Sequence, residues 1–491
     1  MNGDRSCRWV SSFVVAVLAI VALPRPAAFA DEAQWKTYND AAMNAFIAED
    51  YAKAEELYLL ALKTAEELGP THEKLAISWN NLAFIYVAQE KYAQAEAPMK
   101  RSLAISEQRM GPDHPMLGQS MKQLAFIYFE QAKYDQAEPL TKRVLTMDEK
   151  NLGPEHPRVA TDLSKLALLY MKQAKHDQAE PLLERAFAIT EKWPRPDDPD
   201  VAVSLSNLAE VYREQAKYDQ AESLFKRAVA IWEKALGPDA PQVATLLNKL
   251  AIMYTNLARY DQAERLLNRA LAIEEKTGAR GRPFVGQILG RLAFAYDQQG
   301  RYNQAEPAYK RSLIIIEKTL GPDHLDVART LHRLAGLYVN QGKHDQAEPL
   351  YKRSLEIREK VLGPDHLDVA ASLTALALLY YDQARYDAAE PLYRRSLAIR
   401  EKALGPNHPE VAASLRLLAV LYLKQARYDQ AEPLCKRSLA IREKALGPNH
   451  LDVAWSLETY AVLLKATNRT AEAEEMLKRA AAIRERRGGK P

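Results

Sequence analysis

Cysteine is nearly absent from this sequence. Among 491 residues only Cys7 and Cys435 occur, and Cys7 lies in an N-terminal segment that we expect to be removed. One remaining thiol cannot form an internal disulfide, so packing alone must hold the mature chain together. Cys435 takes a helix position that Tyr351 and Tyr393 occupy elsewhere in the chain, and we expect it to be a buried, unreactive thiol.

The sequence also lacks a charge of one dominant sign. Lys plus Arg number 67 and Asp plus Glu number 64, a net charge of +3, with both signs mixed along the chain. No basic block supports a surface that follows nucleic-acid phosphates, so we expect no nucleic-acid partner. The phosphate-binding motifs Gly-x-x-x-x-Gly-Lys-Ser/Thr and Gly-x-Gly-x-x-Gly are missing as well, and we expect no cofactor.

Long apolar runs are missing except at the start. One run, from Trp9 to Leu23, follows Arg5 and Arg8 and precedes Ala28-Phe29-Ala30. The run is shorter than the roughly 20 residues of a membrane-spanning helix. A basic start, a short apolar stretch and a small-residue cleavage site predict a cleaved signal peptide over residues 1–30 and export to the periplasm or the extracellular space. An uncleaved membrane anchor is the alternative.

What the sequence has in abundance is internal repetition. An Ala-Glu pair recurs from Ala95-Glu96 to Ala473-Glu474, and tyrosines recur every 42 residues, at positions 86, 128, 170, 212, 254, 296, 338, 380 and 422. Ten strict units follow a first unit that is one residue shorter. We therefore predict about eleven repeats over residues 31–487 and a disordered tail at 488–491.

Each repeat predicts two antiparallel helices. In one repeat, apolar residues at helical spacing indicate a first helix over residues 115–131 and a second over residues 134–152. Asp113 is expected to cap the first helix, and Gly153 suits the left-handed position after the second. The connection between the two helices is short, which favours antiparallel packing.

Two repeated residues carry packing information. An alanine three positions before each tyrosine, such as Ala83 before Tyr86, allows the two helices to approach closely. The tyrosine ring is expected to fill space toward the next repeat. Because a single hairpin cannot bury both faces of its helices, the repeats must stack into an all-α solenoid.

These residues resemble the tetratricopeptide-repeat (TPR) pattern. Trp79-x-x-Leu82-Ala83-x-x-Tyr86 matches its first half and Ala221-x-x-x-Phe225 its second half. The 42-residue period and the segment from His344 to Leu355 are similar to the kinesin-light-chain type of TPR, here in a bacterial exported form. The resemblance implies a right-handed superhelix whose first helices line a concave groove for a protein or peptide. No heptad segment for a motor chain precedes the repeats, so a motor-adaptor role is not implied.

We expect no enzymatic activity and no metal site. Seven of the ten histidines lie in the loop between repeats, one in each. Stacked helices lie roughly 10 Å apart, too far for two such histidines to share a zinc ion at bond lengths of about 2 Å. We interpret them as loop residues that bond the adjacent helix end. Repeated carboxylates such as Asp345 and Glu348 are also spread over the repeats, which fits charges near helix starts better than acid–base catalysis.

A ligand surface is expected on the first helix of each repeat. The positions that face the groove in the resembling family vary along this chain while the packing positions stay constant, as a binding surface would. Drift at exposed positions is the alternative. The early repeats are apolar with one lysine, the middle repeats are polar, and the later repeats carry arginine and tyrosine. The predicted ligand-contacting residues are Asn80, Phe84, Lys122, Phe126, Phe129, Asn248, Arg329, His332, Tyr381 and Arg416.

The sequence therefore predicts a scaffold that binds a protein or peptide and mediates protein–protein interactions. The alternative is a self-assembling solenoid without a dedicated peptide ligand, which would need apolar residues on a terminal helix. The last helix, from Thr470, reads as a solvated cap, whereas Trp35 and Tyr38 on the first helix offer an N-terminal contact.

Overall fold

A computed structural model describes residues 28–192, 199–278 and 282–486. Most of the expected signal peptide and the expected tail at 488–491 lie outside these residues. The described residues form 22 α-helices and no strand. In chain order the helices are α2 (Ala28–Ile47), α3 (Tyr51–Glu67), α4 (Glu73–Ala88), α5 (Tyr92–Met110), α6 (Leu117–Glu130), α7 (Tyr134–Leu152), α8 (Pro157–Lys172), α9 (His176–Lys192), α10 (Pro199–Glu214), α11 (Tyr218–Leu236), α12 (Pro241–Asn256), α13 (Tyr260–Lys276), α14 (Pro283–Gln298), α15 (Tyr302–Leu320), α16 (Leu325–Asn340), α17 (His344–Leu362), α18 (Leu367–Asp382), α19 (Tyr386–Leu404), α20 (Pro409–Lys424), α21 (Tyr428–Leu446), α22 (Leu451–Ala466) and α23 (Thr470–Arg486).

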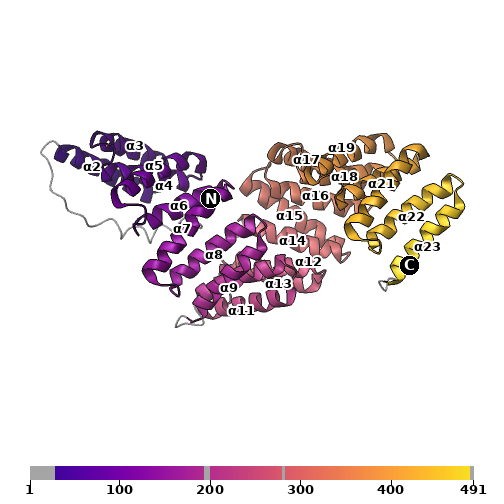
Figure 1. Ribbon diagram of the computed structural model, residues 1–491, viewed down its shortest axis with the longest axis horizontal. Helices are drawn as coiled ribbons and strands as arrows, with labels where there is room; N and C mark the ends of the chain where they lie inside the picture. Colours follow the sequence, from indigo (N-terminus) through magenta and orange to yellow (C-terminus); the bar gives the residue numbers. More distant parts are fainter. Residues whose placement is uncertain (1–27, 193–198, 279–281, 487–491) are drawn as a thin grey trace. The chain divides into compact units, whose positions relative to one another are not determined.

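The helices pair into eleven hairpins, from α2 and α3 to α22 and α23. We call the even-numbered helix of each hairpin A and the odd-numbered helix B. The chain divides into two compact units, residues 1–246 and 247–491, and within each unit the hairpins follow one another side by side (Figure 1). The predicted all-α solenoid of helical hairpins is confirmed.

The loops between hairpins give the helices defined ends. Helix α7 has the predicted bounds, and Gly153 after it has a φ of 91°, in the left-handed region that glycine adopts without steric cost. The prediction that Asp113 caps the next helix is wrong. Helix α6 begins at Leu117, and the Nδ1 atom of His114 accepts a hydrogen bond from the backbone N–H of Met116 at 3.3 Å. Aspartate is the commoner cap, but the histidine ring reaches the free N–H here.

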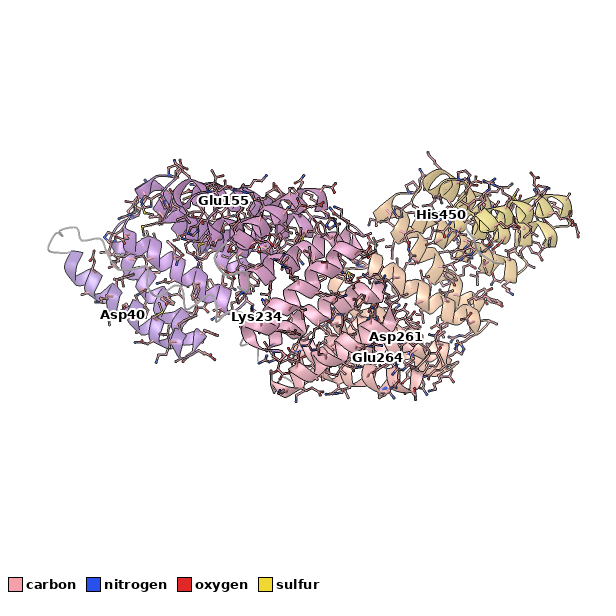
Figure 2. All side chains as sticks on the ribbon, turned by 90° about the horizontal axis from the view of Figure 1, so that it is seen from below. Asp40, Glu155, Lys234, Asp261, Glu264 and His450 are labelled. Carbon is pink, nitrogen blue, oxygen red and sulfur yellow. The ribbon has the colours of Figure 1, made fainter. Side chains whose placement is uncertain are left out.

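Histidines take this role at most hairpin starts, as interpreted from the sequence. In six A helices the Nδ1 atom accepts a hydrogen bond from the backbone N–H two residues later, at 3.1–3.2 Å. His450, labelled in Figure 2, does so at the start of α22. These imidazoles satisfy backbone groups that a helix start leaves unpaired.

Small buried residues bring the A and B helices together. Ala167 and Ala251, each three residues before a repeated tyrosine, are completely buried, as predicted. Buried serines on several B helices add a hydrogen bond, such as the one from the Ser354 hydroxyl to the carbonyl of Ala328 at 2.7 Å. A large side chain at the alanine position would overpack this contact.

The repeated tyrosines contact the preceding hairpin, which corrects the expectation that they point to the next one. The Tyr380 hydroxyl donates to Glu348 of α17 at 2.8 Å, and Arg385 donates to the same carboxylate at 2.7 Å. Hydrogen bonds from Lys352, Arg385 and Tyr380 lower the pKa of Glu348 to about 2. The repeated glutamates thus fasten successive hairpins through hydrogen bonds.

In four pairs of neighbouring hairpins, the A helices approach each other more closely than the B helices do among the described residues. These contacts join α2 with α4, α8 with α10, α14 with α16, and α20 with α22. The A side is therefore the inner side of the local curvature in each unit, and we call its exposed surface the inner face. None of the described helices combines the length and apolar character needed to cross a membrane.

Candidate functional site

An apolar strip lies on the inner face at one repeated position of the A helices. In the first unit it contains Phe126 of α6 and Leu168 of α8, whose side chains are 45% and 43% exposed. In the second unit the same position holds Leu378 of α18 and Val462 of α22, which are 38% and 58% exposed. We call these four residues the apolar strip.

The predicted aromatic residues of the first unit lie at this strip, with unequal exposure. Phe84 is half-buried and packs on Phe46, with ring centroids 5.2 Å apart. Phe126 contacts the edge of Tyr92 at 6.1 Å but remains open to solvent, and Phe129 packs against Tyr134 at 5.7 Å. Each ring is held in place from one side, which leaves an anchored apolar surface.

The two predicted polar residues of the first unit are less available. Asn80 is half-buried. Lys122 of α6 forms ion pairs with Asp148 of α7 at 2.9 Å and with Asp162 of α8 at 3.0 Å. Its ammonium group is therefore engaged by two carboxylates of the fold instead of standing free for a ligand.

The predicted residues of the second unit also differ in exposure. Asn248 is buried, and its Oδ1 atom has no hydrogen-bond partner among the described residues. Tyr381 is half-buried beside Tyr386, with ring centroids 5.7 Å apart. Arg416 is half-buried, and its Nε atom is buried without a partner in the described part of the chain.

Arg329 and His332 lie on the same A helix, α16, with opposite exposure. The Arg329 side chain is 54% exposed and pairs with Asp326 at 3.0 Å. The His332 ring packs edge-on against Tyr351 of α17 at 5.1 Å. Burial, followed by the charges of Arg358 and Arg333, lowers the pKa of His332 to about 4, so the imidazole is neutral at pH 7.

Possible catalytic or metal-binding groups are dispersed or buried. Across the three described stretches, no three His, Cys, Asp or Glu residues gather where they could hold a metal ion. Cys435 is buried in α21, and burial raises the pKa of its thiol to about 12. The Cys435 side chain therefore packs as predicted.

The repeat model of one family covers most of the chain. The model of the tetratricopeptide repeat matches residues 35–108, 79–150, 116–192, 158–233, 200–276, 284–360, 326–402, 382–434 and 410–486. The chain is a tetratricopeptide-repeat protein. No curated protein matches the sequence of this TPR protein.

Solved structures similar to this TPR protein include kinesin-light-chain-like proteins. BtubC (BKLC) from P. vanneervenii shares 22% identity at a TM-score of 0.40, over 48% of this chain and 91% of its own. A Podosopora anserina putative kinesin light chain with nearly identical TPR-like repeats shares 28% identity at a TM-score of 0.38, over 42% and 98%. Human IFIT1, solved as a dimer with PPP-AAAA, shares 16% identity at a TM-score of 0.49, over 91% and 90%.

Several inner-face residues of the TPR protein were not predicted from the sequence. Trp455 of α22 is 47% exposed, close along the helix to Val462 of the apolar strip. A pocket in the second unit is lined by the predicted His332 and also by Phe294, Arg333 and Gly336, which were not predicted. The available signal was Gly336 itself, because other repeats carry Phe126, Phe294 or Leu378 at that position.

Proposed function

We propose that this TPR protein is an exported, non-enzymatic scaffold that binds a peptide segment of a partner protein along the inner face of its A helices. The apolar strip carries the proposal. Single exposed apolar side chains are common on protein surfaces. Each unit carries two of them at one repeated position of its A helices, and each pair offers an apolar surface that a partner could cover.

Polar groups beside the strip favour a peptide with mixed side chains. Phe126 and Phe129 would contact apolar side chains, because large aromatic residues commonly anchor interfaces. Arg329 keeps an exposed guanidinium group although it pairs with Asp326, so it could also bind an acidic side chain. Lys122 is excluded from this role because its charge is already neutralised. Export rests on the signal-like residues 1–30.

A selected peptide tests the proposal directly. A random peptide library displayed on phage would be screened against residues 31–491, and the affinity of a selected peptide would be measured by fluorescence anisotropy. Replacing Phe126 and Leu168 with alanine should weaken binding about ten-fold or more, because both are proposed anchors. The matched control replaces Leu236 of α11 and Ile314 of α15, exposed apolar residues on B helices. Equal losses in both double variants would refute the inner face as the site.

Self-assembly is the second candidate function, and exposed apolar residues of the first hairpin favour it. Trp35 is buried and donates from Nε1 to the Ser78 hydroxyl at 2.8 Å, so the expected contact through Trp35 is wrong. Met43 and Ile47 of α2 are instead 39% and 70% exposed. Sedimentation velocity of residues 31–491 with and without Met43→Glu and Ile47→Glu would show an association that depends on this surface.

The expected absence of a nucleic-acid partner and the expected absence of enzymatic activity both stay predictions. An RNA oligonucleotide added to the same anisotropy assay should leave the signal unchanged, since no basic block lies along the chain. Enzymatic activity is not expected because repeated carboxylates and histidines such as Glu348 and His450 are spread one per hairpin and engaged in contacts of the fold.

A further inference from the structure

The second unit contains a pocket that the peptide proposal does not use. Its volume is about 260 Å³, and it lies between A helices α14 and α16 and B helix α17. Phe294 and Val339 supply apolar walls, while the polar groups come from Asp297, Gln298, His332, Arg333, Asn340 and Tyr351. A few polar groups on an apolar wall are typical of small-ligand sites, and this volume is at the small end of their range.

Gly336 makes the pocket possible. It occupies the apolar-strip position in α16, where other A helices carry Phe126, Phe294 or Leu378. A Cβ atom at Gly336 would lie 3.5 Å from the Tyr351 hydroxyl, which is ordinary contact, so the backbone itself does not require glycine. Glycine within a helix costs roughly 1 kcal/mol relative to alanine. The chain therefore carries a helix-destabilising glycine at this position, and a larger side chain there would fill the pocket.

One arginine, Arg333 of α16, lines the pocket without an ion-pair partner among the described residues. Arg291 occupies the same repeated position on α14, lies close enough for the two charges to interact but outside the lining, and both arginines are half-buried. Neither forms an ion pair with a carboxylate of the described residues, and the Nη1 atom of Arg291 is buried without a hydrogen-bond partner there. The Arg333 guanidinium lies over the Phe294 ring at 4.6 Å. Burial and, next, the charge of Arg333 lower the pKa of Arg291 to about 10.

The nearby carboxylates do not supply the missing charge. Asp326 pairs with Arg329 at 3.0 Å and accepts a hydrogen bond from Gln287 at 2.9 Å. Asp297 is buried in the pocket wall, where Asn340 donates to it at 3.4 Å, and burial raises the pKa of its carboxyl group. A buried guanidinium without an anion is unfavourable, so a bound anion would relieve the imbalance.

The pocket favours an anion with one charge. A dianionic phosphate would place excess negative charge beside Asp297, whereas a carboxylate adds a single charge that Arg333 can bind through two parallel hydrogen bonds. Phe294 and Val339 offer an apolar surface for the rest of the ligand. We propose that the pocket binds a small free carboxylic acid in its ionised form, with an aromatic or branched apolar body about the size of one side chain.

Phenylacetate is a suitable probe, and isothermal titration calorimetry with residues 31–491 is the measurement. Arg333→Gln should weaken binding at least ten-fold, because a charge-assisted hydrogen bond contributes about 1.5–3 kcal/mol. Gly336→Leu should abolish binding by filling the pocket. The matched control is Arg353→Gln on α17, an exposed arginine that pairs with Glu317 at 2.6 Å; it should bind phenylacetate as the unchanged chain does. Far-UV circular dichroism verifies that each variant is folded.

Three further ligands test which chemical feature of the probe is required for binding. Phenylethanol, which lacks the charge, should not bind. Tighter binding of inorganic phosphate than of phenylacetate would overturn the choice of a carboxylate. Binding of acetyl-Ala-Glu-Ala-amide without binding of phenylacetate would overturn the free acid and assign the pocket to a side chain of a protein ligand. Phenylacetate binding that survives Gly336→Leu would place the ligand elsewhere. None of these measurements depends on the peptide proposal.

Discussion

Three repeated positions hold opposite chemistry in the two units of the chain. In the first unit they are Lys122, Asp148 and Asp162, from α6, α7 and α8; 210 residues later they are His332, Arg358 and Ser372, from α16, α17 and α18. We call these the acidic cluster and the basic cluster. The same backbone therefore places two carboxylates in one unit and an arginine in the other.

The two clusters are neutralised in different ways. Lys122 bridges both carboxylates of the acidic cluster within 3.0 Å. Arg358 donates to the Ser372 hydroxyl at 2.7 Å and to the carbonyl of Asp368 at 3.1 Å, and among the described residues it has no carboxylate partner. The basic cluster also borders Arg333, which is likewise unpaired. The carboxylates of the first cluster are thus paired with a cation within the fold, whereas the arginine of the second makes no ion pair among the described residues.

The substitution with the largest expected effect on stability removes the lysine of the acidic cluster. Lys122→Met leaves Asp148 and Asp162 facing each other in a buried site, and should lower the free energy of unfolding by about 3 kcal/mol. The charges of Lys165 beside Asp162 and of Arg158 beside Asp148 remain and keep the loss at the lower end of the usual range. Urea unfolding followed by circular dichroism, with hydrogen exchange of α6–α8, measures the loss.

The control for this prediction is an exposed lysine of the same unit. Lys142 of α7 pairs with Glu138 at 2.7 Å, and its side chain is 53% exposed. Lys142→Met should cost less than about 1 kcal/mol. A similar loss in the two variants would mean that the acidic cluster is no more important than a surface ion pair.

The second effect concerns pH. Burial, then the hydrogen bond with Asp148, raises the pKa of Asp162 to about 6, above the value of about 3.9 in an unfolded chain. The native state thus holds this proton more tightly, and ionisation of Asp162 reduces stability as the pH rises through 6. Asp162→Ser, which installs the residue found at Ser204 and Ser372, should raise the free energy of unfolding at pH 7.5 by about 1–2 kcal/mol.

The gain from Asp162→Ser should shrink as the pH falls to 4.5, because the native carboxyl group is then protonated in the unchanged chain. Urea midpoints of both chains at the two pH values make the comparison. A variant that is less stable at pH 7.5 would show that the ion pair with Lys122 outweighs the cost of burying Asp162.

The sequence predicted the scaffold better than these clusters. Period and spacing located the hairpins and the bounds of α7, because both follow from the pattern within one repeat. Lys122 was placed on the ligand surface because its two partners come from other helices, 26 and 40 residues away. Trp35 was expected to be exposed because its partner, Ser78, lies 43 residues later. Side chains that depart from the repeat pattern form contacts with one another. The partners are far apart in the sequence, so only their positions in space identify them.

The third effect should have the opposite sign to the first. Arg291→Met removes a half-buried guanidinium that forms no ion pair among the described residues and has a buried, unpartnered Nη1 atom, and replaces it with an apolar side chain of similar length. The free energy of unfolding without ligand should therefore rise by about 1 kcal/mol. Urea unfolding with hydrogen exchange of α14–α16 is the measurement. A loss of stability equal to that of Lys122→Met would show that Arg291 is satisfied within the fold.

The smallest expected effect on stability tests whether the two units differ at positions outside the clusters. The turn between helices A and B has a residue in the left-handed region in both units, Ala174 in the first with φ of 55° and Gly342 in the second with φ of 71°. An L side chain is strained there, so Ala174→Gly should add about 0.5 kcal/mol to the free energy of unfolding and Gly342→Ala should remove about 1 kcal/mol. Urea midpoints, with hydrogen exchange of the two turns, detect both shifts. Shifts of opposite sign would show that the backbone energetics of the repeat are alike in the two units, so that the contrast between the clusters comes from their side chains. Shifts of the same sign would place the difference in the backbone of the units instead.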